Sequence, residues 1–423
     1  MNPILSFKYV NYHAFRREDA CLGLVIHNIS IAFDDKHATA ASNQFGLYVE
    51  SVFNFSGHTS RFGQVISYFA VFDANSHESR IHTLAFRSRG SIIPLMILSL
   101  ITITISATAQ ISFGGYGEVS YRNVENATDS FDVHRVVLYT GYEFDETYSF
   151  SAEIEFEHGD EIHVEFAHID GNYSEALNVR AGHILLPMGF MNQTHEPTTF
   201  WSAKRPIVER FVIPSTWHEN GIGVWGSDSN LTWQAYFVNG TDDGFDIQSS
   251  GLRGGRQNGE RAAAEKMGFT ARLDYQVAAG LQIGTAIYTG GTNNSTSSGA
   301  EHHVQVVEAH VQYDNGPLRV RGLFADASVE NSAQLPTTST TDDIDGWYVE
   351  AGYDLLSSDD DTSLTPFARV EQYDLGEQVD INMVGIAFQP NLNIIYKFDL
   401  QNITSETGGQ DSDNIEFTIG WSF

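Results

Sequence analysis

Polar and apolar side chains alternate over many short segments of this sequence, and this period of two constrains the fold more than any other feature. In Glu153–Glu157 and Glu161–Phe166, Glu or His occupies every second position, with Ile, Val or Phe between them. Such alternation places one set of side chains on each face of a β-sheet. We find sixteen such runs after residue 110 and no convincing long helix. The runs are 111–121, 131–143, 148–157, 161–170, 177–185, 221–227, 231–239, 267–277, 281–290, 303–313, 318–330, 345–354, 364–373, 380–389, 392–401 and 414–423.

The connections between these runs alternate in length. Every second connection is short, as at Asp228–Asn230 and Ala278–Gly280, whereas Leu186–Asn220 and Gly240–Lys266 are long. Tight turns on one side and long loops on the other are typical of outer-membrane barrels. Because every backbone amide must pair inside a bilayer, such a sheet has to close on itself. The sequence therefore predicts an all-β fold, a transmembrane antiparallel β-barrel of about 16 strands, or 14 if weak runs fail to form strands.

A second feature divides the chain near residue 110. Residues 92–109 carry an apolar run after a basic flank and end in Ala107-Thr108-Ala109, the pattern of a secretory signal peptide cleaved after Ala109. We interpret residues 1–91 as a non-structural or misassigned extension, with the natural start near Met96, and residues 110–423 as the exported barrel domain. The alternatives are a buried strand or membrane anchor at 92–109, and a functional N-terminal domain.

The chain is strongly acidic, with 54 Asp and Glu against 23 Lys and Arg and a net charge of -31. This charge argues against a nucleic-acid partner, because a polyanion would repel it. The single cysteine, Cys21, precedes the barrel domain, which therefore has no disulfide and no cysteine-ligated metal. The last run ends in Phe423, and a terminal aromatic after such a strand resembles the signal by which bacterial outer-membrane barrels are recognised for insertion.

One segment carries a more specific pattern. It comprises Gly182–Phe190, with a Pro-x-Gly turn at Pro187–Gly189, then His195-Glu196-Pro197, Lys204-Arg205-Pro206 and Ile213–Gly223. This pattern resembles that of bacterial porins related to the phosphate-selective porin O and P family, and the broader resemblance spans roughly residues 110–423. The resemblance implies a 16-stranded, water-filled and commonly trimeric barrel. It also implies a lysine- and arginine-lined phosphate path, whereas the lysines of residues 110–423 are only Lys204, Lys266 and Lys397.

The third outer loop, Leu186–Asn220, is too long for an ordinary hairpin, and ordered loops of that length are usually functional. We expect it to fold into the barrel and form the constriction of the pore. The alternatives are a loop that covers the mouth or packs in a subunit contact. The residues expected near the constriction are Glu196, Lys204, Arg205, Glu209 and Arg210.

Strand parity assigns the inner wall of the barrel. If Ile154, Phe156, Ile162, Val164 and Phe166 face lipid, an acidic lumen wall follows, made by Glu153, Glu155, Glu157, Glu161 and Glu165. The expected basic lumen wall on other strands is Arg135, Arg180, Arg272, Arg319, Arg321 and Arg369. Acidic side chains in a pore favour cations, so the excess of acids predicts a weak cation preference. Alternatively, most acids lie on outer loops and bind divalent ions that bridge lipopolysaccharide.

The sequence offers no enzymatic or metal motif. His163 and His168 point to opposite faces of a strand and cannot share one metal, and no Gly-x-Ser-x-Gly elbow is present. We therefore expect an outer-membrane porin of a Gram-negative bacterium that passes small hydrophilic solutes or ions, without cofactor, metal or covalent chemistry. Expected partners are outer-membrane lipid, lipopolysaccharide and two further copies of the chain in a homotrimer. The alternatives are a surface receptor or adhesin barrel and a secreted β-rich carbohydrate-active enzyme.

Overall fold

The computed structural model describes residues 25–32, 48–54, 67–72, 111–293, 301–335, 341–356 and 361–423. The chain divides into two units, Met1–Thr104 and Ile105–Phe423. In the first unit, β1 (Val25–Ala32), β2 (Tyr48–Asn54) and β3 (Ser67–Phe72) form an antiparallel sheet in that order. The predicted signal segment 92–109 lies outside the described residues.

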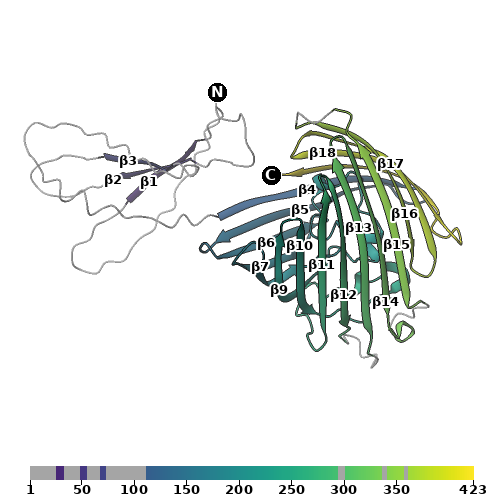
Figure 1. The fold of residues 1–423 in the computed structure, drawn as a ribbon. Coiled ribbons are helices and arrows are strands. Elements are labelled where there is room, and N and C mark those ends of the chain that lie inside the picture. Colours follow the sequence, from purple (N-terminus) through teal and green to yellow (C-terminus); the bar gives the residue numbers. More distant parts are fainter. Residues whose placement is uncertain are drawn as a thin grey trace, which may run out of the picture. The chain divides into compact units, whose positions relative to one another are not determined.

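The second unit is a closed antiparallel barrel of sixteen strands, drawn as arrows in Figure 1. The sixteen predicted runs are confirmed, and each strand pairs with its neighbours in chain order. The strands are β4 (Ile111–Val124), β5 (Ser130–Glu143), β6 (Tyr148–Glu157), β7 (Glu161–Asn172), β8 (Asn178–Leu185), β9 (His218–Asp228), β10 (Leu231–Asn239), β11 (Met267–Ala278), β12 (Leu281–Gly291), β13 (His303–Asn315), β14 (Leu318–Val329), β15 (Asp343–Tyr353), β16 (Ser363–Asp374), β17 (Gln378–Asn391), β18 (Ile394–Ser405) and β19 (Ser412–Ser422).

Closure depends on pairing between the last strand and the first. β19 pairs with β4 from Asn414 opposite Val124 to Ser422 opposite Tyr116. Beyond the strand end, the Phe423 amide donates to the Gly115 carbonyl at 2.9 Å, and the Gly115 amide donates to the Phe423 carbonyl at 3.0 Å. Because no strand keeps an unpaired edge, the ring satisfies its own backbone hydrogen bonds.

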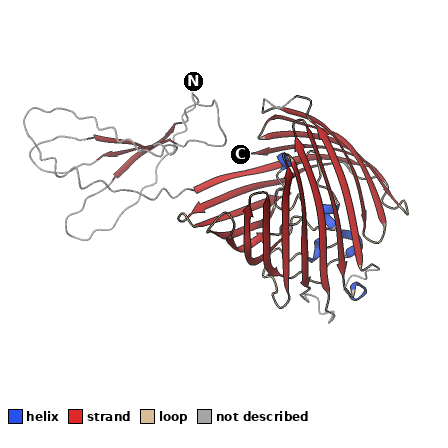
Figure 2. Ribbon diagram, in the orientation of Figure 1, coloured by secondary structure: helices blue, strands red, loops and turns tan. Residues whose placement is uncertain are grey.

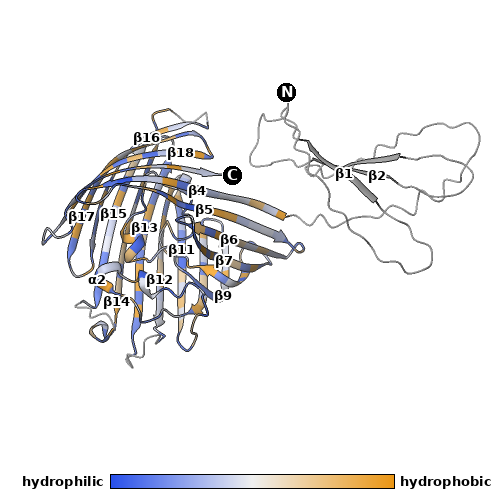
Figure 3. Cartoon of the chain, turned by 180° about the vertical axis from the view of Figure 1, so that it is seen from behind, coloured by the Kyte–Doolittle hydropathy of each residue, from blue (hydrophilic) through white to orange (hydrophobic). Residues whose placement is uncertain are grey.

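The outer face of the barrel is apolar, and β15 shows the pattern most simply. Trp347 and Val349 are exposed on the outside, whereas Tyr348 and Glu350, which alternate with them, are buried on the inside. Other strands expose Phe237, Phe324, Val384 and Phe398 in the same way. The alternation is visible as neighbouring orange and blue segments along the strands in Figure 3. The charged side chains of the barrel are therefore directed mainly inward.

One strand departs from simple parity. A bulge between Glu153 and Ile154 in the β6–β7 pairing sets Glu153 opposite Phe166 and leaves Glu165 as the extra residue. Opposed residues share a face, so Phe166 points inward, where its ring lies 5.2 Å from that of His168. The prediction that Phe166 faces outward is therefore wrong, because parity cannot register an inserted residue.

Helical turns occupy the long connections. They are η3 (Pro197–Thr199) and α1 (Val208–Phe211) in one loop, α2 (Ile247–Ser250) and η4 (Arg253–Gly255) in the next long loop, and η5 (Ser332–Gln334). Figure 2 shows helices in blue, several of them enclosed by the red strands. Within the described part of the chain, no helix combines the length and apolarity needed to cross a membrane.

Candidate functional site

The long loop between β8 and β9, residues 186–217, is closed at its base by one buried side chain. The Asn192 side-chain amide donates to the carbonyls of Leu186 at 2.6 Å and Trp217 at 2.9 Å, and its oxygen accepts from the Trp217 amide at 2.5 Å. Gly189 in the Pro-x-Gly turn has a φ of 63°, and a Cβ there would lie 2.4 Å from a Glu209 oxygen. The turn therefore requires glycine both for its backbone and for its close approach to Glu209.

The loop reaches strands that are far from β8 and β9 around the ring. The Val208 amide donates to Glu371 on β16 at 2.7 Å, and the Ala203 amide donates to Asp399 on β18 at 2.6 Å. Lys397 on β18 donates to the Ser202 carbonyl at 3.1 Å. These three strand residues are buried and alternate with outward-facing neighbours. The loop therefore contacts inner-wall side chains on the far side of the barrel.

Glu209 is an anchor within this loop. Its carboxylate is fully buried, accepts from the Met191 amide at 2.6 Å and accepts from the Tyr348 hydroxyl at 2.5 Å. Burial raises the pKa of Glu209, although both hydrogen bonds act in the opposite direction. The Glu209 carboxylate therefore holds the loop against β15, and its place at the constriction stays a prediction.

The remaining loop residues expected at the constriction differ in their environments. Glu196 accepts a hydrogen bond from Tyr139 on β5 at 3.0 Å. Arg205 is half-buried and donates to the His195 carbonyl at 3.4 Å, whereas Arg210 is exposed. Burial lowers the pKa of Lys204 to about 8. Among the described residues, no carboxylate lies within ion-pair distance of the Lys204, Arg205 or Arg210 side chains.

A second long loop, residues 240–266, adds two arginines that sequence reasoning did not single out. Arg253 donates to the Ser215 carbonyl, and Arg256 donates to the Thr216 carbonyl. Both arginines are half-buried and have no carboxylate partner among the described residues. Both arginines stand in the sequence run Leu252–Arg256, but nothing in that run indicates that the loop 240–266 contacts the loop 186–217.

The two loops and the wall of the barrel enclose a charged cavity of about 60 Å³. Carboxylates on β6 and β7 form one side, and arginines of the two loops lie among the other lining residues. The lining is Arg135, Glu155, Glu157, His163, Glu165, Arg205, Thr216, His218, Arg253, Arg256 and Asn258. Opposed acidic and basic side chains produce a field across the space between them. This charged cavity is the candidate functional site.

The arginines of the predicted basic wall on the strands are all paired with carboxylates. Each of its arginines has a carboxylate partner close by, which the buried ones among them require. Arg135 lies 3.0 Å from Glu118 and 3.1 Å from Glu155, so it belongs to the acidic region itself. The other pairs are Arg180 with Asp170, Arg272 with Asp274, Arg319 with Asp314, Arg321 with Glu350, and Arg369 with Glu350 and Glu371.

The structure brings most residues of the predicted acidic wall together on the inside of the barrel. Glu153, Glu155 and Glu165 are buried on the inside, and Glu157 lines the cavity. Glu161 is exposed at the start of β7, next to His163 at 3.7 Å, and is not among the residues lining the cavity. The acidic region thus covers the inner face of β6 and part of β7.

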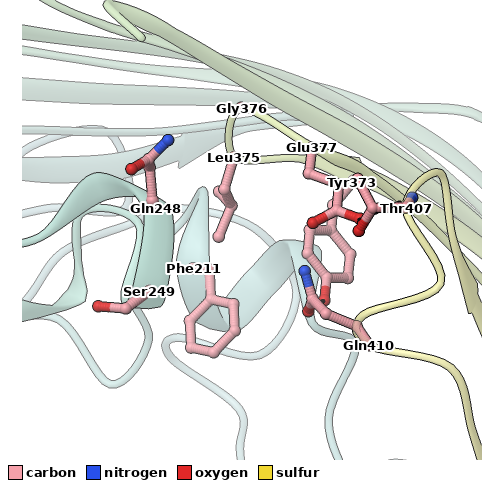
Figure 4. Close-up of a pocket in the computed structure, with 9 residues that line it drawn as sticks. All are labelled: Phe211, Gln248, Ser249, Tyr373, Leu375, Gly376, Glu377, Thr407 and Gln410. Atoms are coloured by element: carbon pink, nitrogen blue, oxygen red, sulfur yellow. Dashed lines mark hydrogen bonds between the residues drawn. The ribbon is translucent and has the colours of Figure 1, made fainter. Parts of the chain in front are cut away.

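A larger hollow of about 340 Å³ lies near the outer ends of β16 and β18 (Figure 4). The rings of Phe211 and Tyr373 line it together with Gln248 and Gln410. Its one carboxylate, Glu377, already accepts hydrogen bonds from Thr407. Although this hollow is larger, it lacks the opposed charges of the cavity between the loops and β6–β7.

Comparison with known proteins places the chain in a family. A protein of Aquifex aeolicus (strain VF5), described as an uncharacterized protein, is 32% identical over 350 residues, which cover 74% of this chain and 80% of that protein. The chain belongs to the family of this protein. No protein-family model matches the chain.

Solved structures show which fold this family member has. OmpT of Vibrio cholerae with loop L8 deleted, an outer membrane protein, matches with a TM-score of 0.54 at 9% identity, over 75% of this chain and 100% of that one. An anion-selective porin from Comamonas acidovorans matches with a TM-score of 0.52 at 10% identity, over 74% and 100%. The outer membrane channel DcaP of Acinetobacter baumannii matches with a TM-score of 0.51 at 10% identity, over 74% and 97%. The barrel therefore has the fold of outer-membrane porins.

Proposed function

We propose that this protein is an outer-membrane porin through which small hydrophilic solutes diffuse passively. The observation that carries the proposal is a closed sixteen-stranded ring whose outside is apolar and whose inside holds the opposed charges of the candidate site. A ring of this size is wide enough for an aqueous channel, and the loop 186–217 would narrow it. Diffusion through such a channel involves no covalent chemistry and no cofactor. The resemblance to the phosphate-selective porin family supports the same class of protein.

The apolar outer face supports residence in the outer membrane, since a belt of this kind is stable only against lipid. Asp326, Asp345 and Asp374 lie side by side on β14, β15 and β16 near the outer ends of these strands. Divalent ions held by such carboxylates would bridge to lipopolysaccharide phosphates. We further propose a homotrimer, as is common for porins of the family that the sequence resembles.

Cationic loop residues favour anions at the narrowest part of the channel. Lys204, Arg205, Arg253 and Arg256 have no carboxylate partner among the described residues, whereas Glu155 on the opposite side of the cavity is paired with Arg135. A fixed charge without a partner contributes more to the local potential than a neutralised one. We therefore propose an anion preference, in place of the weak cation preference expected from the excess of acids.

Planar-bilayer recording tests both parts of the proposal. The purified protein should form open channels of steady conductance, and a KCl gradient should give a reversal potential of the sign that chloride selectivity produces. A different outcome would favour a second candidate, a surface receptor. The apolar cluster that Ile184, Val208, Ile213, Phe245 and Ile247 form inside the barrel is the observation that favours this receptor, because it fills part of the bore. A plugged receptor would insert into the membrane without conducting.

The anion preference should decrease as the pH rises from 7 to 9. Lys204 is charged below its pKa of about 8 and neutral above it, so the high pH removes one positive charge from the constriction. One charge near the path of an ion changes the permeability ratio by about twofold at moderate salt. Reversal potentials at the two pH values measure the effect. The Lys204→Met variant should show a smaller difference between them, and an unchanged difference would contradict the assignment to Lys204.

A further inference from the structure

Three side chains from separate parts of the chain meet beside the candidate site. Glu153 comes from β6, Glu165 from the bulge in β7, and His195 from the loop 186–217. The His195 Nε2 atom lies 2.9 Å from Glu165 Oε2 and 3.5 Å from Glu153 Oε1. Only 1% of each glutamate and 2% of the histidine are exposed. One nitrogen and two oxygen donors thus converge in a place that is closed to bulk solvent.

The orientation of His195 leaves its inner nitrogen free to act as a ligand. Its Nδ1 atom lies 3.2 Å from the Asn192 carbonyl, so in the neutral ring a proton on Nδ1 would donate to that carbonyl and leave the Nε2 lone pair for a ligand. Neither His195 Nε2 nor Glu165 Oε2 has a partner in hydrogen-bond geometry. A carbonyl that fixes the tautomer in this way is the usual second contact of a metal-bound histidine.

Hydroxyl groups donate to both carboxylates, to the Glu165 oxygen turned away from His195 and to the Glu153 oxygen that faces it. The Tyr116 hydroxyl donates to Glu153 Oε1 at 3.1 Å, and the Thr216 hydroxyl donates to Glu165 Oε1 at 3.0 Å. These donors orient both glutamates but add no positive charge. Arg135, the nearest arginine on the wall, is already paired with Glu118 and Glu155. Two buried carboxylates therefore face His195, and their charge is balanced either by a proton on the His195 ring or by a bound cation.

We propose that Glu153, Glu165 and His195 bind one divalent transition-metal cation of the zinc type. Zinc bound by a histidine and two carboxylates has bonds of about 2.0–2.2 Å, which place tetrahedral ligands about 3.3 Å apart. The two distances from Nε2 bracket that value. Calcium and magnesium are disfavoured because they take six or more oxygen ligands or waters, which this closed place does not supply. A water molecule would complete the coordination.

The bound ion would fasten the constriction loop to the wall of the barrel. His195 follows the turn that Asn192 closes, and the two glutamates lie on neighbouring strands. The site does not depend on conduction, because the same three ligands would bind metal in a barrel that is closed to solutes. Failure of the metal site and failure of the proposed porin function are therefore distinguishable.

Zinc titration of the detergent-solubilised full chain tests the proposal, with zinc chloride as the only ligand. We expect one tight site per chain, and His195→Gln and Glu165→Gln should each weaken it at least tenfold. Cobalt should give the visible absorption bands of a four-coordinate ion in the native protein and not in either variant. Unheated gel electrophoresis establishes that each variant is a folded barrel.

Two less buried clusters provide controls. Asp132, His134 and His158 form one, and Glu157, Glu161 and His163 form the other. His158→Gln and His163→Gln should leave the tight site unchanged. Absence of tight binding to the native protein would show that a proton occupies the place between His195 and the glutamates. Binding that survives His195→Gln and is lost in His163→Gln would move the site to the cluster of Glu157, Glu161 and His163; either result overturns the proposal.

Discussion

Replacing Arg205, Arg253 and Arg256 together by glutamate should reverse the ion preference of the channel from anions to cations. The three arginines line the charged cavity opposite Glu155, Glu157 and Glu165, so the variant would present carboxylates on both sides. Each charge at about 6 Å in an aqueous setting contributes about 0.7 kcal/mol to the energy of a passing ion. Three changes from +1 to -1 alter the local charge by about six units, so a large effect remains after screening by salt. The permeability ratio should therefore change at least tenfold, which corresponds to about 1.4 kcal/mol.

Reversal potentials in a KCl gradient measure this effect, and two variants control it. The triple glutamine variant removes the charge without inverting it and should give an intermediate ratio. Arg261→Glu changes an exposed arginine of the same loop that does not line the cavity, and it should leave the ratio close to that of the native channel. If Arg261→Glu shifts the ratio as much as the triple variant does, net charge sets the preference and the cavity does not.

Val349→Arg should destabilise the barrel in a bilayer by about 2 to 4 kcal/mol. Val349 lies near the middle of β15, is 45% exposed, and points outward between the buried Tyr348 and Glu350. An arginine at this position would be held in the hydrocarbon part of the membrane, where a charge on the lipid face of a barrel costs about this much. Reversible denaturant unfolding in lipid vesicles gives the free energy of unfolding of the variant and of the native protein.

Tyr353→Arg is the matched control, since Tyr353 is exposed on the same face at the end of the same strand. At the edge of the membrane the same arginine should cost at most about 1 kcal/mol, because it reaches the polar headgroups. Equal effects at positions 349 and 353 would contradict a lipid-facing belt and favour a barrel surrounded by water.

The strands were predictable because their information is local. In β6, Glu153 and Glu155 are followed by Ile154 and Phe156, and this alternation indicates both the strand and its two faces. The turn at Ser229–Asn230 could be placed for the same reason, since two short alternating runs flank it. The inward position of Phe166 was missed because the bulge at Glu165 is a property of how β7 pairs with β6. No pattern within β7 alone distinguishes a bulged residue from a regular one.

Only the residues that supply the charges of the candidate site were predictable from the sequence, and not their partners. The carboxylates of β6 and the basic residues of the loop 186–217 were identified from spacing and loop length. Their partners were not, because Arg135 meets Glu155 through strand register and Arg256 meets Thr216 through the packing of two loops. Glu209 illustrates the limit: its sequence neighbours are typical of an exposed loop, yet the fold buries its carboxylate against Tyr348.

The sequence by itself determined the closed sheet, since sixteen alternating segments with one apolar face can satisfy their backbones only by forming a ring with that face outward. It also determined that the inside is charged. The tertiary structure alone decided which charges face one another, which remain without a partner, and that His195 lies between two glutamates. The reason is physical: alternation is fixed by the geometry of each residue and its neighbours, whereas ion pairs form between residues brought together by register, bulges and loop packing across the barrel.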